Sequence, residues 1–129
     1  MRMKCRRNFY RIDFLLSAIY TPQLDISQMD EWDWHDCLIA NLSLGGASII
    51  TKEERKSGEQ LWLEFNLDTN NILCNMLVCH VEKLKTETSH SYKLGVQFSN
   101  ILENDKNIIA RYVAKYQMKE MRSKGANQA

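Results

Sequence analysis

The sequence has no long run of apolar residues, and it contains only one proline and five glycines among 129 residues. A membrane helix needs about 18 uninterrupted apolar residues, and the basic N-terminus is not followed by the apolar core of a signal peptide. Scarce proline and glycine exclude a collagen-like or low-complexity chain. These absences predict one globular domain that resides in the cytoplasm and does not insert into a membrane.

The sequence also lacks the signatures of disulfide scaffolds, metal sites and common enzymes. Its four cysteines include no Cys-x-x-Cys pair, and a chain of this length can bury a core without disulfides, so we expect free thiols. Asp33, His35 and Cys37 alternate, but no second cluster completes a zinc site. No P-loop, dinucleotide glycine pattern or nucleophile elbow is present. We therefore predict no metal, no cofactor and no catalytic residue, and we do not expect an enzyme.

Charge is nearly balanced, with a net charge of +1, but it is distributed unevenly along the chain. The first eleven residues contain five basic residues and no acid, whereas Asp25–Asp36 contains five carboxylates and no Lys or Arg. Because a basic segment repels itself and attracts anions locally, we predict a flexible basic arm over residues 1–11. The acidic segment includes Trp32 and Trp34. These tryptophans either pack onto the core or form a contact surface for a partner protein.

Alternating apolar residues predict six strands separated by polar turns. The strands are expected at residues 12–20, 34–42, 47–51, 61–65, 72–84 and 91–99. Gly58 is the expected positive-φ position in the turn before the fourth strand. Short antiparallel strands at this spacing favour a small barrel or a sandwich over a parallel sheet.

The last segment of the chain changes to helical spacing. Its apolar face consists of Ile108, Ile109, Tyr112, Val113 and Tyr116. We predict a helix over about residues 104–124, with Asn104 or Asp105 as its N-cap and Gly125 as its stop. Residues 125–129 are expected to fray.

Two polar motifs frame the first strands. The first is Arg7-Asn8-Phe9-Tyr10-Arg11, directly preceded by Arg6, and the second is Asn41-Leu42-Ser43-Leu44-Gly45-Gly46 at a strand corner. Together they match, at every defined position, the Arg-x-x-x-Arg and Asp/Asn-x-Ser-x-x-Gly patterns of the PilZ family. The segment Leu94–Ser99 and the C-terminal helix extend this match, so the chain resembles the PilZ family over nearly its whole length.

The resemblance implies a mainly β fold: a six-stranded antiparallel β-barrel with a C-terminal helix over residues 12–124. It also implies a receptor that binds the bacterial second messenger cyclic di-GMP without catalysis. The implied ligand-binding residues are Arg6, Arg7, Arg11, Asn41, Ser43, Gly45 and Gly46.

These residue types suit a ligand with two phosphates and two guanines. An arginine fork binds phosphate oxygens, or the acceptors of guanine, in a bidentate way. Asn41 offers an amide to the guanine edge, Ser43 offers a hydroxyl, and the glycines allow backbone N–H groups to approach a ligand. In the family, an additional arginine at the position of Arg6 accompanies two stacked ligand molecules. We therefore expect an intercalated ligand dimer.

Ligand binding is expected to order the arm and change the surface that a protein partner contacts. Such receptors control motility, exopolysaccharide synthesis or virulence in the family. With six residues before Arg7, we expect no preceding domain and a stand-alone adaptor, either a monomer or a weak dimer. The alternative is a protein-interaction module of the same fold that does not depend on nucleotide. A nucleic-acid polymer is not an expected partner, because the basic residues concentrate at the ends of the chain.

Overall fold

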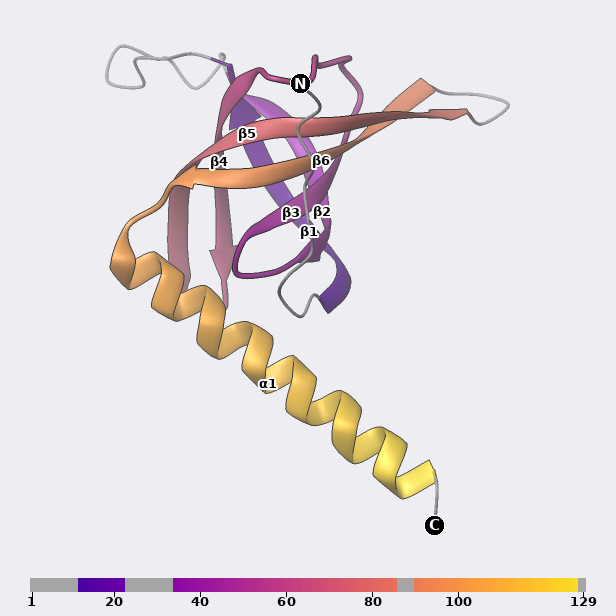
Figure 1. Ribbon diagram of the computed structural model, residues 1–129, viewed down its shortest axis with the longest axis vertical. Coiled ribbons are helices and arrows are strands. Elements are labelled where there is room, and N and C mark those ends of the chain that lie inside the picture. The colour runs from indigo at the N-terminus through magenta and orange to yellow at the C-terminus, as the bar shows by residue number, and fades with distance from the viewer. Residues whose placement is uncertain (1–11, 23–33, 86–89, 128–129) are drawn as a thin grey trace.

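Six antiparallel strands form a closed barrel in the computed structural model, which describes residues 12–22, 34–85 and 90–127 (Figure 1). The strands are β1 (Ile12–Thr21), β2 (His35–Leu42), β3 (Gly46–Thr51), β4 (Gln60–Leu67), β5 (Asn70–Lys85) and β6 (His90–Asn100). Their order around the barrel is β1-β2-β3-β6-β5-β4, and β4 pairs with β1 to close it. The predicted six-stranded antiparallel barrel is therefore confirmed, and the sandwich alternative is excluded.

The core follows from the alternation of side chains along each strand. In β4, Leu61, Leu63, Phe65 and Leu67 are buried, while the residues between them are more exposed. Successive residues of a strand point to opposite faces, so a barrel strand places every second side chain inside. The expected positive φ of Gly58, in the turn before β4, is confirmed at 92°.

The turn between β4 and β5 is tighter than the sequence suggested. The mostly polar residues 66–71 predict a turn of six residues, but Leu67 pairs directly with Asn70. Only Asp68 and Thr69 lie between the strands, and Asp68 takes a φ of 55°. Asp tolerates this left-handed conformation better than most residues do. The wholly buried side chain of Leu67 extends β4 to the end of the barrel.

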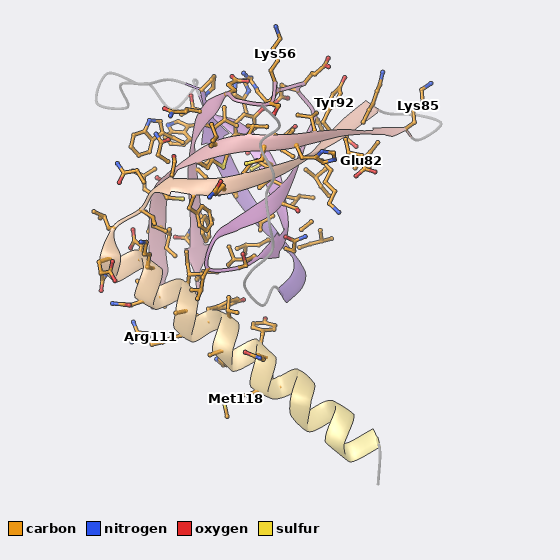
Figure 2. The ribbon with its side chains drawn as sticks, in the orientation of Figure 1. Lys56, Glu82, Lys85, Tyr92, Arg111 and Met118 are labelled. Carbon is orange, nitrogen blue, oxygen red and sulfur yellow. The ribbon has the colours of Figure 1, made fainter. Side chains whose placement is uncertain are left out.

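The hairpin of β5 and β6 extends beyond the barrel (Figure 1). Its pairing continues from Glu82 opposite Lys93 to Lys85 opposite His90. Figure 2 labels Glu82, Lys85 and Tyr92 along this extension. The register shifts twice along the pair, once after Val78, which is the behaviour of β-bulges and bends the strands.

The C-terminal helix α1 (Glu103–Asn127) covers one end of the barrel, and its later turns extend past it (Figure 1). Ile108, Ile109 and Val113 are buried in the core, as their spacing predicts. Tyr112 and Tyr116 pack at its margin, and their rings contact each other in a tilted arrangement with centroids 4.9 Å apart. The first three turns of α1 are thus an integral part of the barrel.

Both ends of α1 differ from the expected positions. The N–H of Lys106 donates to the carbonyl oxygen of Leu102 at 3.0 Å, so the helix begins before Asn104 and Asp105. Asp105 instead lies buried in the first turn, where the helix dipole stabilises a carboxylate. At the other end the helix continues past Gly125. A glycine inside a helix costs only about 1 kcal/mol relative to alanine, so it does not oblige a helix to end.

Candidate ligand-binding site

The pairing of β1 with β2 places the start of β1, which directly follows the first motif in the sequence, at the same end of the barrel as the second motif. Ile12 pairs with Leu42, and Asp13 pairs with Asn41. Arg11 directly precedes Ile12, and Ser43 directly follows Leu42. The basic arm therefore joins the barrel beside the Asn-x-Ser-x-x-Gly motif. Arg6 and Arg7, like Arg11 and the rest of residues 1–11, lie outside the described residues, so their roles stay predictions.

The turn between β2 and β3 is held by its own serine. The N–H of Ser43 donates to the carbonyl oxygen of Gly46 at 2.9 Å, and its hydroxyl donates to the same oxygen at 3.3 Å. The N–H of Gly45 in turn donates to the hydroxyl oxygen of Ser43 at 3.3 Å. The hydroxyl thus acts as donor and acceptor inside the turn. One lone pair of its oxygen remains for a ligand.

The neighbouring strand β6 leaves no space for a side chain at Gly46. A Cβ placed on it would overlap the backbone carbonyl oxygen of Val96 in β6. The N–H of Phe98 also donates to the carbonyl oxygen of Gly45 at 2.9 Å, so β6 holds both glycines of the motif. The close approach expected between these glycines and a ligand stays a prediction. Their demonstrated contact is with β6.

Asn41 has a structural role that the sequence did not reveal. Its side-chain oxygen Oδ1 accepts the N–H of Ser48 in β3 at 3.1 Å, and the side chain is buried. This bond lies where the β2–β3 register shifts between Ile39 and Asn41, and it satisfies a backbone donor there. A carbonyl oxygen has two lone pairs, so Oδ1 can still accept from a guanine.

The outer face of the barrel beside the motif is a row of small and polar residues. Asn41 pairs with Ser48, and Ser48 pairs with Gly95 across β3 and β6. The neighbours of Ser48 along β3, Ala47 and Ile49, belong to the core, so Ser48 points away from it, although the side chains of Ser48 and Asn41 are themselves buried. The sequence did not indicate Ser48 and Gly95, because alternation predicts the face on which a residue lies but not which residues of other strands align with it.

At the opposite end of the barrel, a group of polar side chains makes hydrogen bonds and ion pairs with one another. The hydroxyl of Tyr20 donates to Glu53 at 2.6 Å, and burial followed by this bond raises the pKa of the tyrosine. The guanidinium of Arg55 lies 5.4 Å from the centre of the Tyr20 ring and 3.2 Å from Glu59. His35 lies 3.7 Å from the carboxylate of Glu53. These contacts link the end of β1 and the start of β2 to the loop between β3 and β4.

Among the described residues, the cysteines form no disulfide, and neither a metal site nor a membrane-spanning helix is found. Cys37, Cys74 and Cys79 are free and buried, and burial is the main cause that raises the pKa of Cys37 and of Cys74 to about 12. Within residues 12–22, 34–85 and 90–127, no group of His, Cys, Asp and Glu side chains could hold a metal ion. No helix in these ranges is long and apolar enough to cross a bilayer.

Solved structures with the same architecture superpose on this chain. The Bacillus subtilis inhibitor of motility, MotI/DgrA, gives a TM-score of 0.70 at 22% identity, and the alignment covers 88% of this chain and 52% of that one. The PilZ domain of YcgR with c-di-GMP, from Escherichia coli, gives 0.65 at 14% identity over 96% of this chain and 99% of that one. The K. pneumonia MrkH–c-di-GMP complex gives 0.67 at 15% identity over 92% and 55%.

The chain therefore spans about half of the MotI/DgrA and MrkH chains, but nearly all of the YcgR domain. At these identities the superpositions establish the fold. The comparison with curated proteins finds no match. A sequence model of the PilZ domain matches residues 6–115, from Arg6 through the six strands and into α1. On the strength of this match, which includes both motifs, the chain belongs to the PilZ domain family.

Proposed function

We propose that this protein is a receptor for cyclic di-GMP that acts by binding, without catalysis, in the cytoplasm. The observation that carries the proposal is the pairing of Ile12 with Leu42, which joins the arginine arm to the barrel beside the Asn-x-Ser-x-x-Gly turn. A ligand with two phosphates and two guanines needs cationic forks and a polar surface together. This end of the barrel offers both.

In the proposed complex the ligand lies on the outer face of the barrel over Asn41 and Ser48. Arg7 and Arg11 bind its phosphates or the acceptor edge of a guanine, and Oδ1 of Asn41 accepts from a guanine donor. Because the turn bonds of Ser43 and the Asn41–Ser48 bond hold this surface in advance, it loses little freedom on binding. In this proposal the arm provides positively charged side chains, and the barrel provides a preformed polar surface.

Binding is proposed to signal by ordering the arm. Its five basic residues repel one another until phosphate neutralises them. Ordering would occur where β1 begins, and β1 is a strand that α1 contacts. A protein partner that controls motility, exopolysaccharide synthesis or virulence would then recognise the closed arm with the neighbouring surface. Amide hydrogen exchange of residues 2–11 should slow when ligand is added, and unchanged exchange at saturation would refute ordering.

Isothermal titration calorimetry tests the proposal directly. The purified chain should bind cyclic di-GMP with micromolar or tighter affinity and should give no heat with GMP or cyclic GMP. Arg7→Ala and Arg11→Ala should each abolish detectable binding, because each removes charge-assisted bonds worth about 1.5–3 kcal/mol. Arg111→Ala, on the exposed side of α1, is the matched control and should bind normally. No binding by the wild-type chain would favour the nucleotide-independent interaction module.

A further inference from the structure

A cleft lies between α1 and the two-residue turn that joins β4 to β5, and its volume is about 340 Å³. Its lining residues are Asp68, Asn70, Ile108, Arg111, Tyr112 and Lys115. Ile108 belongs to the core and Tyr112 packs against it, so these two form the bottom of the cleft. The other four residues are exposed at its rim. The cleft is therefore apolar at its base, polar at its walls and open to solvent.

The wall that α1 contributes carries two positive charges. Arg111 and Lys115 are four residues apart in the helix, which places their Cβ atoms about 5–6 Å from each other. Among the residues that the structure describes, neither side chain makes a hydrogen bond or an ion pair. The carboxylate of Asp68 lines the same cleft without pairing with either of them. Both cations thus remain available to an anion from outside the chain.

The charges of the cleft do not cancel. Its lining side chains carry one carboxylate and two cations. Burial, followed by the hydrogen bond to Tyr116, raises the pKa of Tyr112 to about 12, so this phenol is neutral at neutral pH. Asn70 is uncharged, and its Nδ2 donates to the carbonyl oxygen of Leu67 at 3.4 Å. The cleft therefore keeps one unit of positive charge, which a single carboxylate of a partner would balance.

An exposed apolar side chain continues this surface along the helix. Met118 follows Arg111 by seven residues, which is nearly two turns, so both lie on the same side of α1 about 10 Å apart along its axis. Figure 2 labels both residues on that side. The side chain of Met118 is largely exposed. Because arginine and methionine are enriched in protein interfaces, this combination favours a protein partner.

We propose that an acidic amphipathic helix of a protein partner binds the surface formed by Asp68, Asn70, Arg111, Lys115 and Met118. A carboxylate of that helix would lie between Arg111 and Lys115, and an apolar side chain about one turn away would cover Met118. A small anion is a poorer fit, because an ion pair that stays exposed to water contributes little. A helix that also covers Met118 excludes water from the pair. The inference goes beyond the proposed function, since none of these residues belongs to the candidate ligand-binding site.

Amide chemical shifts of the full-length chain, titrated with three capped alanine-based helical peptides, test this surface. The first peptide carries glutamate and leucine four residues apart, and the other two replace the glutamate by glutamine or by lysine. The glutamate peptide should shift the amides of residues 68–70 and 108–118 in a saturable way. The glutamine peptide should bind at least about tenfold more weakly, because it lacks the charge that complements the cleft. The lysine peptide should not bind.

Charge reversal locates the contact. The Arg111→Glu/Lys115→Glu variant should lose the glutamate peptide and bind the lysine peptide instead, a gain that an unfolded chain could not show. Lys83→Glu/Lys85→Glu is the matched control, because it makes the same change of charge on the exposed hairpin of β5 and β6, which projects away from α1 (Figure 1). It should bind the glutamate peptide like wild type. Met118→Ala should weaken that peptide by about threefold or more.

Each contrary result would overturn the inference. Absence of saturable shifts with the glutamate peptide would exclude the docking surface, and equal affinity for the glutamine peptide would exclude the carboxylate contact. Equal loss in the hairpin variant would assign binding to net charge alone. Saturation of the same amides by inorganic phosphate, at concentrations where the glutamate peptide does not bind, would make the cleft a small-anion site. Calorimetry of the Arg111→Glu/Lys115→Glu variant with cyclic di-GMP should match wild type, so the proposed function is tested separately.

Discussion

At Gly46 the barrel leaves no room for a side chain, because an added Cβ would overlap the carbonyl oxygen of Val96. Gly46→Ala should force β3 away from β6 and destabilise the protein by about 2 kcal/mol or more in urea unfolding. Gly95→Ala is the matched control, since its Cβ would make an ordinary contact, and it should cost much less. Equal unfolding midpoints for the two variants would contradict the close approach of β3 and β6.

Arg6 is expected to set the number of bound ligands. A second cyclic di-GMP molecule adds two phosphate charges, and another guanidinium offsets their repulsion and offers a further stacking plane. Arg6→Ala should therefore lower the calorimetric stoichiometry from two ligands per chain towards one, while binding itself persists. A ratio of two in the variant would assign ligand pairing to another residue.

At the scale of elements, α1 divides into a packed part and an exposed part. Ile109 is fully buried against the barrel, whereas the side chain of Met118, about two and a half turns later, is 56% exposed, and Figure 2 labels it beyond the barrel. Ile109→Ala should destabilise the protein by about 2–4 kcal/mol because it leaves a cavity. Met118→Ala should change the free energy of unfolding by no more than about 0.5 kcal/mol. Urea unfolding of both variants checks the division, and a costly Met118 variant would contradict it.

For the whole molecule, the buried thiols make stability depend on alkaline pH. Burial, followed by nearby carboxylates, raises the pKa of Cys37 and of Cys74 to about 12. In the unfolded chain both thiols ionise near the ordinary value of about 8.5. The folded state therefore binds more protons above that pH, and each thiol should lower stability by up to about 1.4 kcal/mol per pH unit between about pH 8.5 and 12.

Urea unfolding at pH 8 and at pH 9.5 measures this loss. The expected result is lower stability at the higher pH, and a Cys37→Ala/Cys74→Ala double variant should show a weaker dependence. A double variant with the same pH dependence as wild type would assign the effect to other groups.

Much of the fold could be predicted from local patterns. The six strands and the helix follow from periods of two and of about 3.6 residues, which any stretch of the chain displays by itself. Element ends were less predictable. Leu67 lengthens β4 because the core buries it, and Gly125 stays helical although glycine often marks an end. Such boundaries depend on contacts with distant residues, which a local pattern does not contain.

The residue types of the candidate site could likewise be predicted from the sequence, whereas their contacts with distant residues could not. The types and spacing of Asn41 and Ser43 marked the turn, but their bonds inside the barrel were not evident. Oδ1 of Asn41 bonds to Ser48, and Gly46 faces Val96, fifty residues later in the chain. Ser48 and Gly95 had no signal of their own, because only the register of β2, β3 and β6 aligns them with Asn41.

The sequence by itself determined which residues enter the core, where most turns fall and which two motifs match the family, because these depend on residue type and short spacing. Only the tertiary structure decided the closure of β1 on β4, the pairing of Ile12 beside the second motif, and the row from Asn41 through Ser48 to Gly95. Those features depend on strand register, which is set by the simultaneous packing of all six strands around one core.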